Sequence, residues 1–494
     1  MRLCLYYVVG FTCALSAGVY AQAGVQQAQS ITGAELKGLA PVSDEILKVE
    51  LPKAEEADLD NGLHLMVLED RRVPIVSVQV ILIGAGGYYD PPDHAGLAGF
   101  TASLLREGTA TRSSVEIAEA LETLASRVNV STDMSLQAAT MRLSSLVEYL
   151  DQTIALAADV LLRPSFPEEE LALFKTREQA GLIEQRTRPR FLAVERLAKV
   201  IYGDHPAGRT SPTPETLDRT TRDDLIAFHR EHYVPDHAVI AIAGDISMAD
   251  ALPAVERHFG AWASSGTRPP TVDDPEPIGP SRLYLINREA SVQTNLVVGT
   301  QAINRTSDDY DILSVMNQIV GGGPSSRLFL NLREDKGYTY GAYSSFTAQR
   351  YRGDWDASTE VRTEVTGDAL AELLRELVRI HDEPVPEQEF QDAKRSIVAS
   401  FALSLESPNA LLNNFVVRHL YDLPDDYWDR YPERIMSVTR EQVQEVAAKY
   451  LDAGRLHIVA VGDGEQISGM LTSFGAVDVY DDQGTLIETV GGDQ

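Results

Sequence analysis

The sequence has 494 residues, 44% of them hydrophobic, and a formal net charge of −30 at pH 7. The negative charge is spread along the chain and argues against nucleic-acid binding, which needs a basic face. We expect it to keep the protein soluble, with attraction of cationic peptides as an alternative. Both cysteines, Cys4 and Cys13, lie near the N-terminus. The rest of the chain therefore depends on its hydrophobic core rather than on disulfides.

The N-terminal segment has the pattern of a secretory signal peptide. Arg2 precedes an apolar run over residues 3–19, and the small residues that follow predict cleavage after Ala21 or Ala23. A retained membrane anchor is the alternative, but the run is short for a transmembrane span. The residues before Cys13 do not resemble a lipidation motif. We expect a periplasmic or secreted protein.

The remainder of the chain contains an internal repeat, which affects how every other pattern is interpreted. Thr221-Arg222 opens a predicted helix, and a β-rich run then ends at Gly244-Asp245. Thr439-Arg440 and Gly462-Asp463 repeat this pattern with the same spacing. Each half is therefore predicted to close with a helix followed by a strand.

The repeat predicts an α+β protein with two tandem homologous domains of the α/β-sandwich type. Segments 114–125 and 368–381 carry apolar residues at three- and four-residue spacing, so we expect amphipathic helices that lie on sheets. In chain order, the expected parts are a signal peptide 1–23, an N-terminal extension 24–45, a first domain 46–263, a Pro-, Ser- and Gly-rich linker 264–281, a second domain 282–480 and a tail 481–494.

Residues 61–109, from NGLHLMVLED to LLREGT, contain a recognisable motif. This segment resembles the N-terminal domain of the pitrilysin/insulinase metallopeptidases, a superfamily that includes the mitochondrial processing peptidase. The resemblance extends through both halves of the chain. It implies two domains with the fold of the LuxS and processing-peptidase type.

The resemblance also implies that the zinc site of this family is missing here. Active relatives carry H-x-x-E-H on one helix, where two histidines bind zinc and the glutamate activates water. A gapless alignment from His94 to Thr109 places Gly99 and Ser103 at the ligand positions and Ala102 at the position of the general base. We therefore expect no catalytic residue, no metal ligand and no bound cofactor on this chain.

Other residues near this motif do not replace the lost ligands. His94 lies five positions before Gly99, about 140° around a helix from it, so the two cannot face one site. The third ligand in active relatives is a glutamate, and Gly181 lies near its position. Glu178 and Glu184 are close by, and we interpret them as solvated helix residues.

Three histidines in FHREHYVPDH resemble a metal cluster at first sight. His229 and His232 belong to the closing helix of the repeat, Pro235 ends that helix, and His237 follows it. We expect no metal there.

Residues 321–346 resemble the C-terminal domain of the family. By that resemblance, Arg333 and Tyr340 occupy the positions of an arginine and a tyrosine that bind the substrate backbone and stabilise the tetrahedral intermediate. A guanidinium and a phenol are suitable donors for that task. The structural alternative is a surface ion pair for Arg333 and a core position for Tyr340.

Gly321, Gly322 and Gly323 resemble the glycine-rich loop of the non-catalytic subunit in processing peptidases. There they would let an extended peptide approach the backbone closely, although a simple turn is the alternative. No Gly-Lys-Ser/Thr follows, which excludes a phosphate-binding loop.

These features predict a non-catalytic, substrate-binding subunit of a periplasmic insulinase-family metallopeptidase. The expected partner is a zinc-bearing insulinase-family subunit, in a heterodimer or larger complex, and the expected substrates are peptides. One alternative is a stand-alone peptide-binding or scaffold protein. Another is an active zinc peptidase with unorthodox ligands.

Overall fold

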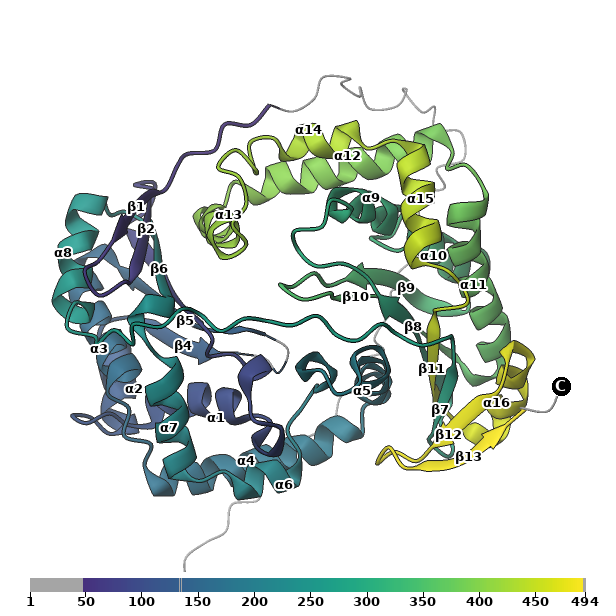
Figure 1. The fold of residues 1–494 in the computed structure, drawn as a ribbon, viewed down its shortest axis with the longest axis horizontal. Helices are drawn as coiled ribbons and strands as arrows, with labels where there is room; N and C mark the ends of the chain where they lie inside the picture. Colours follow the sequence, from purple (N-terminus) through teal and green to yellow (C-terminus); the bar gives the residue numbers. More distant parts are fainter. Residues whose placement is uncertain (1–47, 133, 135, 492–494) are drawn as a thin grey trace, which may run out of the picture. The chain divides into compact units, whose positions relative to one another are not determined.

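A computed structural model describes residues 48–132, 134 and 136–491. The predicted signal peptide and N-terminal extension lie outside these residues. The described chain folds into two halves, each built on one β-sheet with helices packed against it (Figure 1). None of the described helices combines the length and the apolar character that crossing a membrane requires.

The first sheet has the strand order β1-β2-β6-β3-β5-β4 in the described residues. Its strands are β1 (Glu55–Asp58), β2 (His64–Glu69), β3 (Ile75–Ile83), β4 (Arg127–Ser131), β5 (Ala138–Leu146) and β6 (Ala238–Gly244). The helices of this half are α1 (Leu97–Leu104), α2 (Ser114–Thr123), α3 (Leu150–Leu162), α4 (Glu168–Arg186), α5 (Pro189–Tyr202), α6 (Pro214–Arg219), α7 (Arg222–His232) and α8 (Met248–Phe259).

The second sheet has the strand order β13-β12-β7-β11-β8-β10-β9. Its strands are β7 (Leu283–Asn287), β8 (Gln293–Gln301), β9 (Thr339–Phe346), β10 (Asp354–Arg362), β11 (His457–Gly462), β12 (Val477–Tyr480) and β13 (Leu486–Val490). The helices are α9 (Tyr310–Val320), α10 (Arg327–Phe329), α11 (Thr366–Asp382), α12 (Glu387–Ser404), α13 (Pro408–Leu420), α14 (Tyr431–Ser437), α15 (Arg440–Tyr450) and α16 (Gly464–Leu471), with a π-helical turn over Leu330–Asp335.

The two sheets share a five-strand core. The order β2-β6-β3-β5-β4 in the first corresponds to β7-β11-β8-β10-β9 in the second. In both cores the first pair is parallel and the other pairs are antiparallel. The predicted α+β class with two homologous halves is therefore confirmed.

The repeated Thr-Arg and Gly-Asp pairs mark places where the backbone needs particular residues. The Thr221 and Thr439 side chains begin α7 and α15 as capping boxes, each accepting a hydrogen bond from the third N–H of its helix. Gly244 ends β6 with a φ of +139°, and a Cβ there would lie 2.1 Å from the carbonyl oxygen of Ile75. The repeat seen in the sequence is thus a repeat of helix starts and strand ends.

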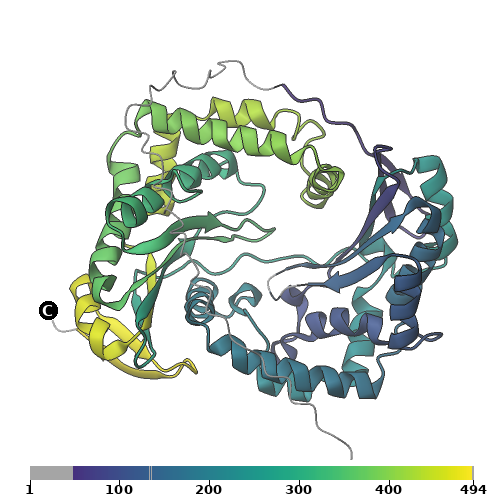
Figure 2. The ribbon, with the colours of Figure 1, turned by 180° about the vertical axis from the view of Figure 1, so that it is seen from behind.

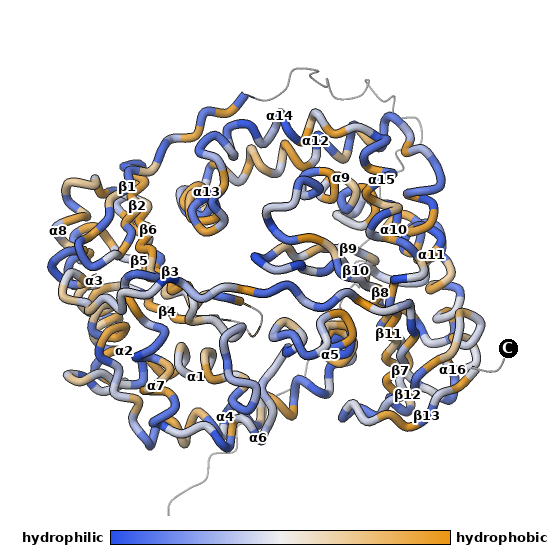
Figure 3. Tube along the Cα trace, in the orientation of Figure 1, coloured by the Kyte–Doolittle hydropathy of each residue, from blue (hydrophilic) through white to orange (hydrophobic). Residues whose placement is uncertain are grey.

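The two halves exchange one helix each. Helix α5 of the first half packs on β8 and β11 of the second sheet, and α13 of the second half packs on β6 of the first (Figures 1 and 2). Figure 3 shows hydrophobic residues along these strands and on both helices. Gly299 in β8 permits the close approach, because a Cβ there would lie 2.8 Å from Leu197 of α5.

Each exchanged helix completes a hydrophobic cluster on the partner sheet. The cluster around α5 includes the buried residues Leu192, Leu197, Ile201, Val297, Val459 and Val461. The cluster around α13 includes Met66, Leu68, Val239, Leu412, Phe415 and Val416. Strands β6 and β11 are buried along their whole length because both of their faces are covered.

Two features concern the domain boundaries drawn from the sequence. In the described chain, no helix or strand lies between α8, which ends at Phe259, and β7, which begins at Leu283, where the linker 264–281 was placed. Strand β13 lies inside the segment 481–494 that was assigned to a tail, and it extends the second sheet by pairing with β12. The described residues from 48 to 491 form one compact unit, so the two halves are not independent bodies.

Candidate functional site

Helix α1 carries the three positions at which the family motif is degenerate. Its first turn is fixed by Asp90, which is 4% exposed and accepts hydrogen bonds from the backbone N–H groups of Gly96 (2.7 Å) and Ala98 (2.8 Å). Arg209 holds the same turn by donating to the Asp90 carbonyl at 2.8 Å. Asp90 thus takes the place of a helix cap at the entrance of α1.

The surroundings of Asp90 also change its acidity. Burial raises the pKa of Asp90 to about 6, although the hydrogen bonds from Ala98 and Gly96 act to lower it. This residue was not singled out from the sequence. The available signal was the position of Asp90, the first of two aspartates shortly before a glycine-containing helix start.

Gly99 and Ser103 lie one helical turn apart and line a cavity of about 210 Å³. A Cβ at Gly99 would meet no atom within 4 Å, so the cavity has room for a side chain at this position. Ala102 is different, because it is 1% exposed and packs in the core of the first half. Two of the three degenerate positions therefore face the cavity.

Helix α4 and strand β4 also line the cavity. Helix α4 contributes Phe174 and Glu178, and the end of β4 contributes Val130 and Ser131. Strand β4 is the edge strand of the first sheet, with β5 on its only paired side in the described residues. A backbone edge with unpaired N–H and C=O groups therefore runs beside the cavity.

The other carboxylate of α4 that the sequence suggested, Glu184, does not line the cavity. Glu184 is exposed and pairs with Arg188 at 2.6 Å one turn further along the helix. Gly181 is also exposed, and a Cβ there would meet no atom within 4 Å. Of the three residues of α4 weighed from the sequence, only Glu178 lines the cavity.

The donors around this cavity do not fit a zinc ion. Protein zinc sites use thiolates, imidazoles and carboxylates, usually three or four together. Among the described residues the cavity offers one carboxylate, Glu178, and the hydroxyl groups of Ser103, Ser131 and Thr132. The arrangement can bind polar groups of a peptide, but it supplies neither the Lewis acid nor the activated water of a metallopeptidase.

The histidines near the motif are engaged elsewhere. His94 lies beside the carboxylates of Asp93 (3.3 Å) and Asp224 (3.8 Å) and does not line the cavity. The Nε2 atom of His229 is 2.7 Å from the Leu161 carbonyl oxygen, and that of His237 is 3.0 Å from the Thr267 carbonyl oxygen.

The third histidine of that group, His232, stacks on Phe228 with ring centroids 4.2 Å apart. Burial lowers the pKa of both His229 and His232, which favours the neutral rings. These histidines therefore occupy separate packing environments.

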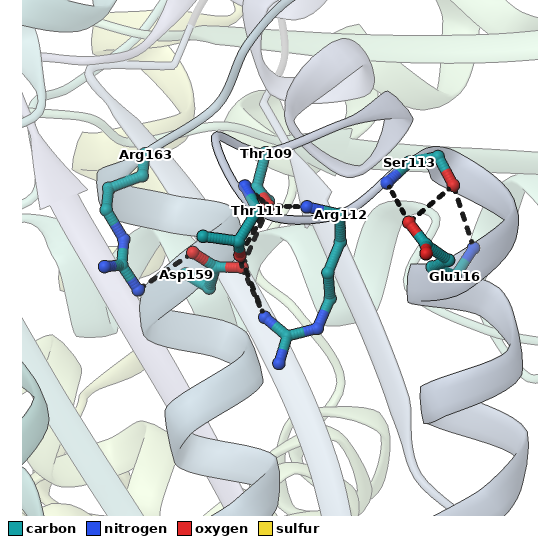
Figure 4. A network of polar contacts seen from close by, with 7 residues as sticks. All are labelled: Thr109, Thr111, Arg112, Ser113, Glu116, Asp159 and Arg163. Atoms are coloured by element: carbon teal, nitrogen blue, oxygen red, sulfur yellow. Dashed lines mark hydrogen bonds and ion pairs between the residues drawn. The ribbon is translucent and has the colours of Figure 1, made fainter.

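The loop that follows α1 is anchored by a buried carboxylate (Figure 4). Asp159 of α3 is 1% exposed and accepts hydrogen bonds from Thr109 (2.9 Å), Thr111 (2.8 Å) and Arg112 (2.6 Å), while Arg163 pairs with it at 2.9 Å. Its pKa is lowered, because these hydrogen bonds outweigh burial, which acts to raise it. The end of the family-like segment is thereby tied to the core.

The second predicted site lies at an edge of the second sheet, with Tyr340 on β9 and Arg333 on the π-helical turn Leu330–Asp335 before it. The Arg333 guanidinium hydrogen-bonds to the backbone carbonyl of Tyr340 and lies 5.1 Å from the Phe329 ring. The Tyr340 side chain is 87% exposed, so a core role for Tyr340 does not apply. Arg333 also lies 3.2 Å from the carboxylate of its neighbour Glu334.

The structure brings Arg333 and Tyr340 together but does not join them to the cavity over α1. Among the described residues, all those that line that cavity belong to the first half. The two predicted sites are therefore separate within this chain. Their predicted role in substrate binding stays a prediction.

The glycine run before α10 packs within the second half. A Cβ at Gly321 would lie 2.3 Å from the backbone nitrogen of Ser344, and its carbonyl accepts the N–H of Ser344 at 3.0 Å. A Cβ at Gly322 would lie 2.5 Å from Gln318. Gly323 has more room, with its nearest neighbour at 3.8 Å. Close packing explains the first two glycines, and contact of this loop with a peptide remains a prediction.

The duplicated five-strand sheet and the degenerate motif on α1 define a two-domain metallopeptidase fold without its metal ligands. The family model described as Insulinase (Peptidase family M16) matches residues 65–215, and the one described as Peptidase M16 inactive domain matches residues 219–397. The chain belongs to peptidase family M16. This confirms the family predicted from the sequence motifs.

Curated relatives include proteins named as proteases and one named as a non-peptidase. The chain is 27% identical over 361 residues to "uncharacterized zinc protease YmxG" of Bacillus subtilis, covering 72% of this chain and 85% of the relative. It is 23% identical over 400 residues to "non-peptidase homolog YmxG" of Helicobacter pylori, covering 80% of this chain and 90% of that relative.

Solved structures show the same fold. The chain matches a peptidase M16 inactive domain from Pseudomonas fluorescens with a TM-score of 0.77 and 27% identity, over 83% of this chain and 98% of that one. It matches a protease from Helicobacter pylori with a TM-score of 0.77 and 18% identity, over 83% and 100%. The second likeness concerns the fold alone.

Proposed function

We propose that this chain is the non-catalytic, substrate-binding subunit of a periplasmic M16-family metallopeptidase. A zinc-bearing subunit of the same family supplies the metal helix, and this chain supplies a second peptide-binding wall in a heterodimer or larger complex. In this proposal, helix α1 of this chain binds no zinc. The periplasmic location follows from the predicted signal peptide.

The observation that carries the proposal is the composition of the cavity over α1. Gly99 and Ser103 face it where the family has zinc ligands, and the remaining donors are one carboxylate and several hydroxyl groups. The cavity lies beside the edge of β4, which can pair with an extended peptide. A cavity beside an open strand edge that lacks metal ligands suits binding rather than hydrolysis.

The second support comes from the exposed pair of Arg333 and Tyr340 at the β9 edge of the second sheet. Tyr340 lies on the edge strand β9, Arg333 lies on the π-helical turn before it, and Arg333 already binds a backbone carbonyl, that of Tyr340. The same chemistry would serve a carbonyl of a bound peptide. A stand-alone peptide-binding protein remains the second candidate, because β4 and its cavity would serve it equally well.

The test is reconstitution with an M16 relative that carries an intact H-x-x-E-H motif. Cleavage of unstructured peptides is measured for the relative alone and with this chain, and then with Arg333→Ala and Tyr340→Phe. We expect both variants to lower kcat/KM at least about tenfold, as loss of a transition-state hydrogen bond does.

The matched control is Tyr480→Phe, which removes a phenol hydroxyl from the same sheet. Tyr480 lies on β12, near the edge of the second sheet that is opposite to β9. Its substitution should leave the rate unchanged. Equal rates for wild type, Arg333→Ala and Tyr340→Phe would refute the assigned role, and peptide binding without any rate gain would favour the stand-alone binder.

A further inference from the structure

Two histidines from different halves of the chain meet away from both sites described above. His64 begins β2 of the first sheet, and His419 lies in the last turn of α13 from the second half. Their rings stack with centroids 4.3 Å apart and planes 15° apart. Glu56 of β1 lies beside them, and one ligand atom from each of the three residues falls within 4.8 Å of the others.

The orientation of His64 is set by a second carboxylate. Asp58 lies 2.7 Å from Nδ1 of His64, so in the neutral ring Nδ1 carries the proton and Nε2 carries the lone pair. A carboxylate that orients an imidazole in this way is the usual outer partner of a metal-binding histidine. The arrangement turns Nε2 of His64 toward Glu56.

The environment of that Nε2 atom is unusual. It is buried and, within the described part of the chain, makes no hydrogen bond. The carboxylate oxygen Oε2 of Glu56 lies 3.3 Å from it. An imidazole lone pair and a carboxylate oxygen that face each other repel unless a proton or a metal ion lies between them.

The charges around the cluster also favour a cation. Arg418 binds the other oxygen of Glu56, Oε1, and pairs with Asp425 at 3.0 Å, which leaves Oε2 directed at His64. Glu56 and Asp425 thus pair with Arg418, while Asp58 pairs with His64, so three carboxylates lie around the cluster beside this arginine.

We propose that Glu56, His64 and His419 form a binding site for a divalent transition-metal ion, with Zn²⁺ as the best fit. Two imidazole nitrogens and one carboxylate oxygen are typical borderline ligands for this ion. Tetrahedral zinc needs donors about 3.4 Å apart, so the His419 ring would turn out of its stack on His64 for nitrogens of both rings to reach one ion. The remaining coordination position is open to water.

The location gives such an ion a structural role. His64 and Glu56 belong to the β1–β2 hairpin of the first sheet, and His419 belongs to the exchanged helix α13. An ion held by all three ties the two halves together at this point. Because it binds only the folded chain, it should raise the unfolding temperature.

The test uses the full mature chain stripped with a chelator and titrated with Zn²⁺. We expect one ion per chain by calorimetry and elemental analysis, a rise of several degrees in the unfolding temperature, and a visible absorption band with Co²⁺. His64→Gln and His419→Gln should each weaken binding about 100-fold or more, and Asp58→Asn about tenfold. Circular dichroism checks folding, and if His64→Gln does not fold, His419→Gln and Glu56→Gln carry the test.

Two control variants show whether zinc binds at this cluster or elsewhere on the chain. His258→Gln removes a half-buried histidine that also lies beside an aspartate, Asp151 at 3.1 Å, but belongs to no group of three ligands in the described residues, so zinc binding should not change. Glu178→Gln removes the carboxylate of the cavity over α1 and should not change it either. The proposal is overturned if the stripped chain binds no zinc, if His419→Gln binds as tightly as wild type, or if Glu178→Gln abolishes binding.

Discussion

The two halves of this chain share one strand order but differ in the chemistry of their sites. In the first half the cavity over α1 is lined by Gly99 and Ser103, where its family has zinc ligands. In the second half Tyr340 is exposed on β9, and Arg333 is exposed on the π-helical turn before it. The buried strands and helix caps that form each core are present in both copies. The comparison shows that packing and site chemistry can diverge independently within one duplicated fold.

The largest expected effect is at the anchor of the first site. Asp159→Ala removes a buried carboxylate that holds Thr109, Thr111 and Arg112, so the free energy of unfolding should fall by about 3–5 kcal/mol. Urea-induced unfolding followed by circular dichroism measures it. The control is Asp151→Ala, whose carboxylate is 52% exposed and should cost less than about 1 kcal/mol. Equal costs for the two variants would contradict the assigned anchor.

The same carboxylate gives a pH dependence with a defined sign. The folded-state pKa of Asp159 lies below its ordinary value of 3.8, since its hydrogen bonds outweigh burial. The stabilisation of the fold by Asp159 is therefore present above pH 3.8 and is lost as the pH falls below that value. Wild type should lose more stability than Asp159→Ala on acidification through this range.

The exchanged helices allow the two halves to be compared directly. Leu197 of α5 and Leu412 of α13 are both buried against the sheet of the other half. Truncation of either to alanine should lower the free energy of unfolding by about 3 kcal/mol, as cavity formation in a core does. Both variants should still unfold in one transition. Two separated transitions in wild type would show that the halves fold independently.

An intermediate effect is expected from the cap of α1. The pKa of Asp90, about 6, lies above its ordinary value of 3.8, so its contribution to stability is complete below 3.8 and is lost as the pH rises through about 6. Asp90→Asn does not titrate. Between about pH 4 and pH 7 the stability of the variant relative to wild type should rise by about 2–3 kcal/mol. A difference that stays constant with pH would refute this assignment.

The smallest expected effects on stability come from alanine substitutions of glycines in the two sites, and the two substitutions should act in opposite directions. Gly99→Ala should stabilise the protein by about 0.5–1 kcal/mol, because the position is helical and a Cβ has room. Gly321→Ala should destabilise it by about 1–3 kcal/mol, because a Cβ would lie 2.3 Å from the Ser344 nitrogen. Thermal unfolding of both variants measures the pair. A destabilised Gly99→Ala would show that the cavity is not open at this position.

Much of the fold was predictable from the sequence. The repeated Thr-Arg and Gly-Asp pairs identified helix caps and strand ends, and those local rules led to two homologous sheets. The segments 114–125 and 368–381 were predicted as helices and correspond to α2 and α11. The exchange of α5 and α13 was not predictable, because an amphipathic pattern shows that a helix has an apolar face but does not show which sheet covers it.

The site was predictable only where residues lie close together in the chain. The alignment placed Gly99 and Ser103 correctly on one helix face, but it could not show that Ala102 is buried away from the cavity. The cluster of Glu56, His64 and His419 was missed because its members belong to different halves and meet only after α13 crosses to the first sheet.

The central claim is that this chain works only with a zinc-bearing partner. The most direct measurement is the rate of peptide cleavage by this chain alone, by an M16 relative with an intact H-x-x-E-H motif, and by the two mixed. We expect no chelator-sensitive cleavage by the isolated chain and a higher kcat/KM for the mixture than for the relative alone. Zinc-dependent cleavage by the isolated chain, or a mixture no faster than the relative, would contradict the claim.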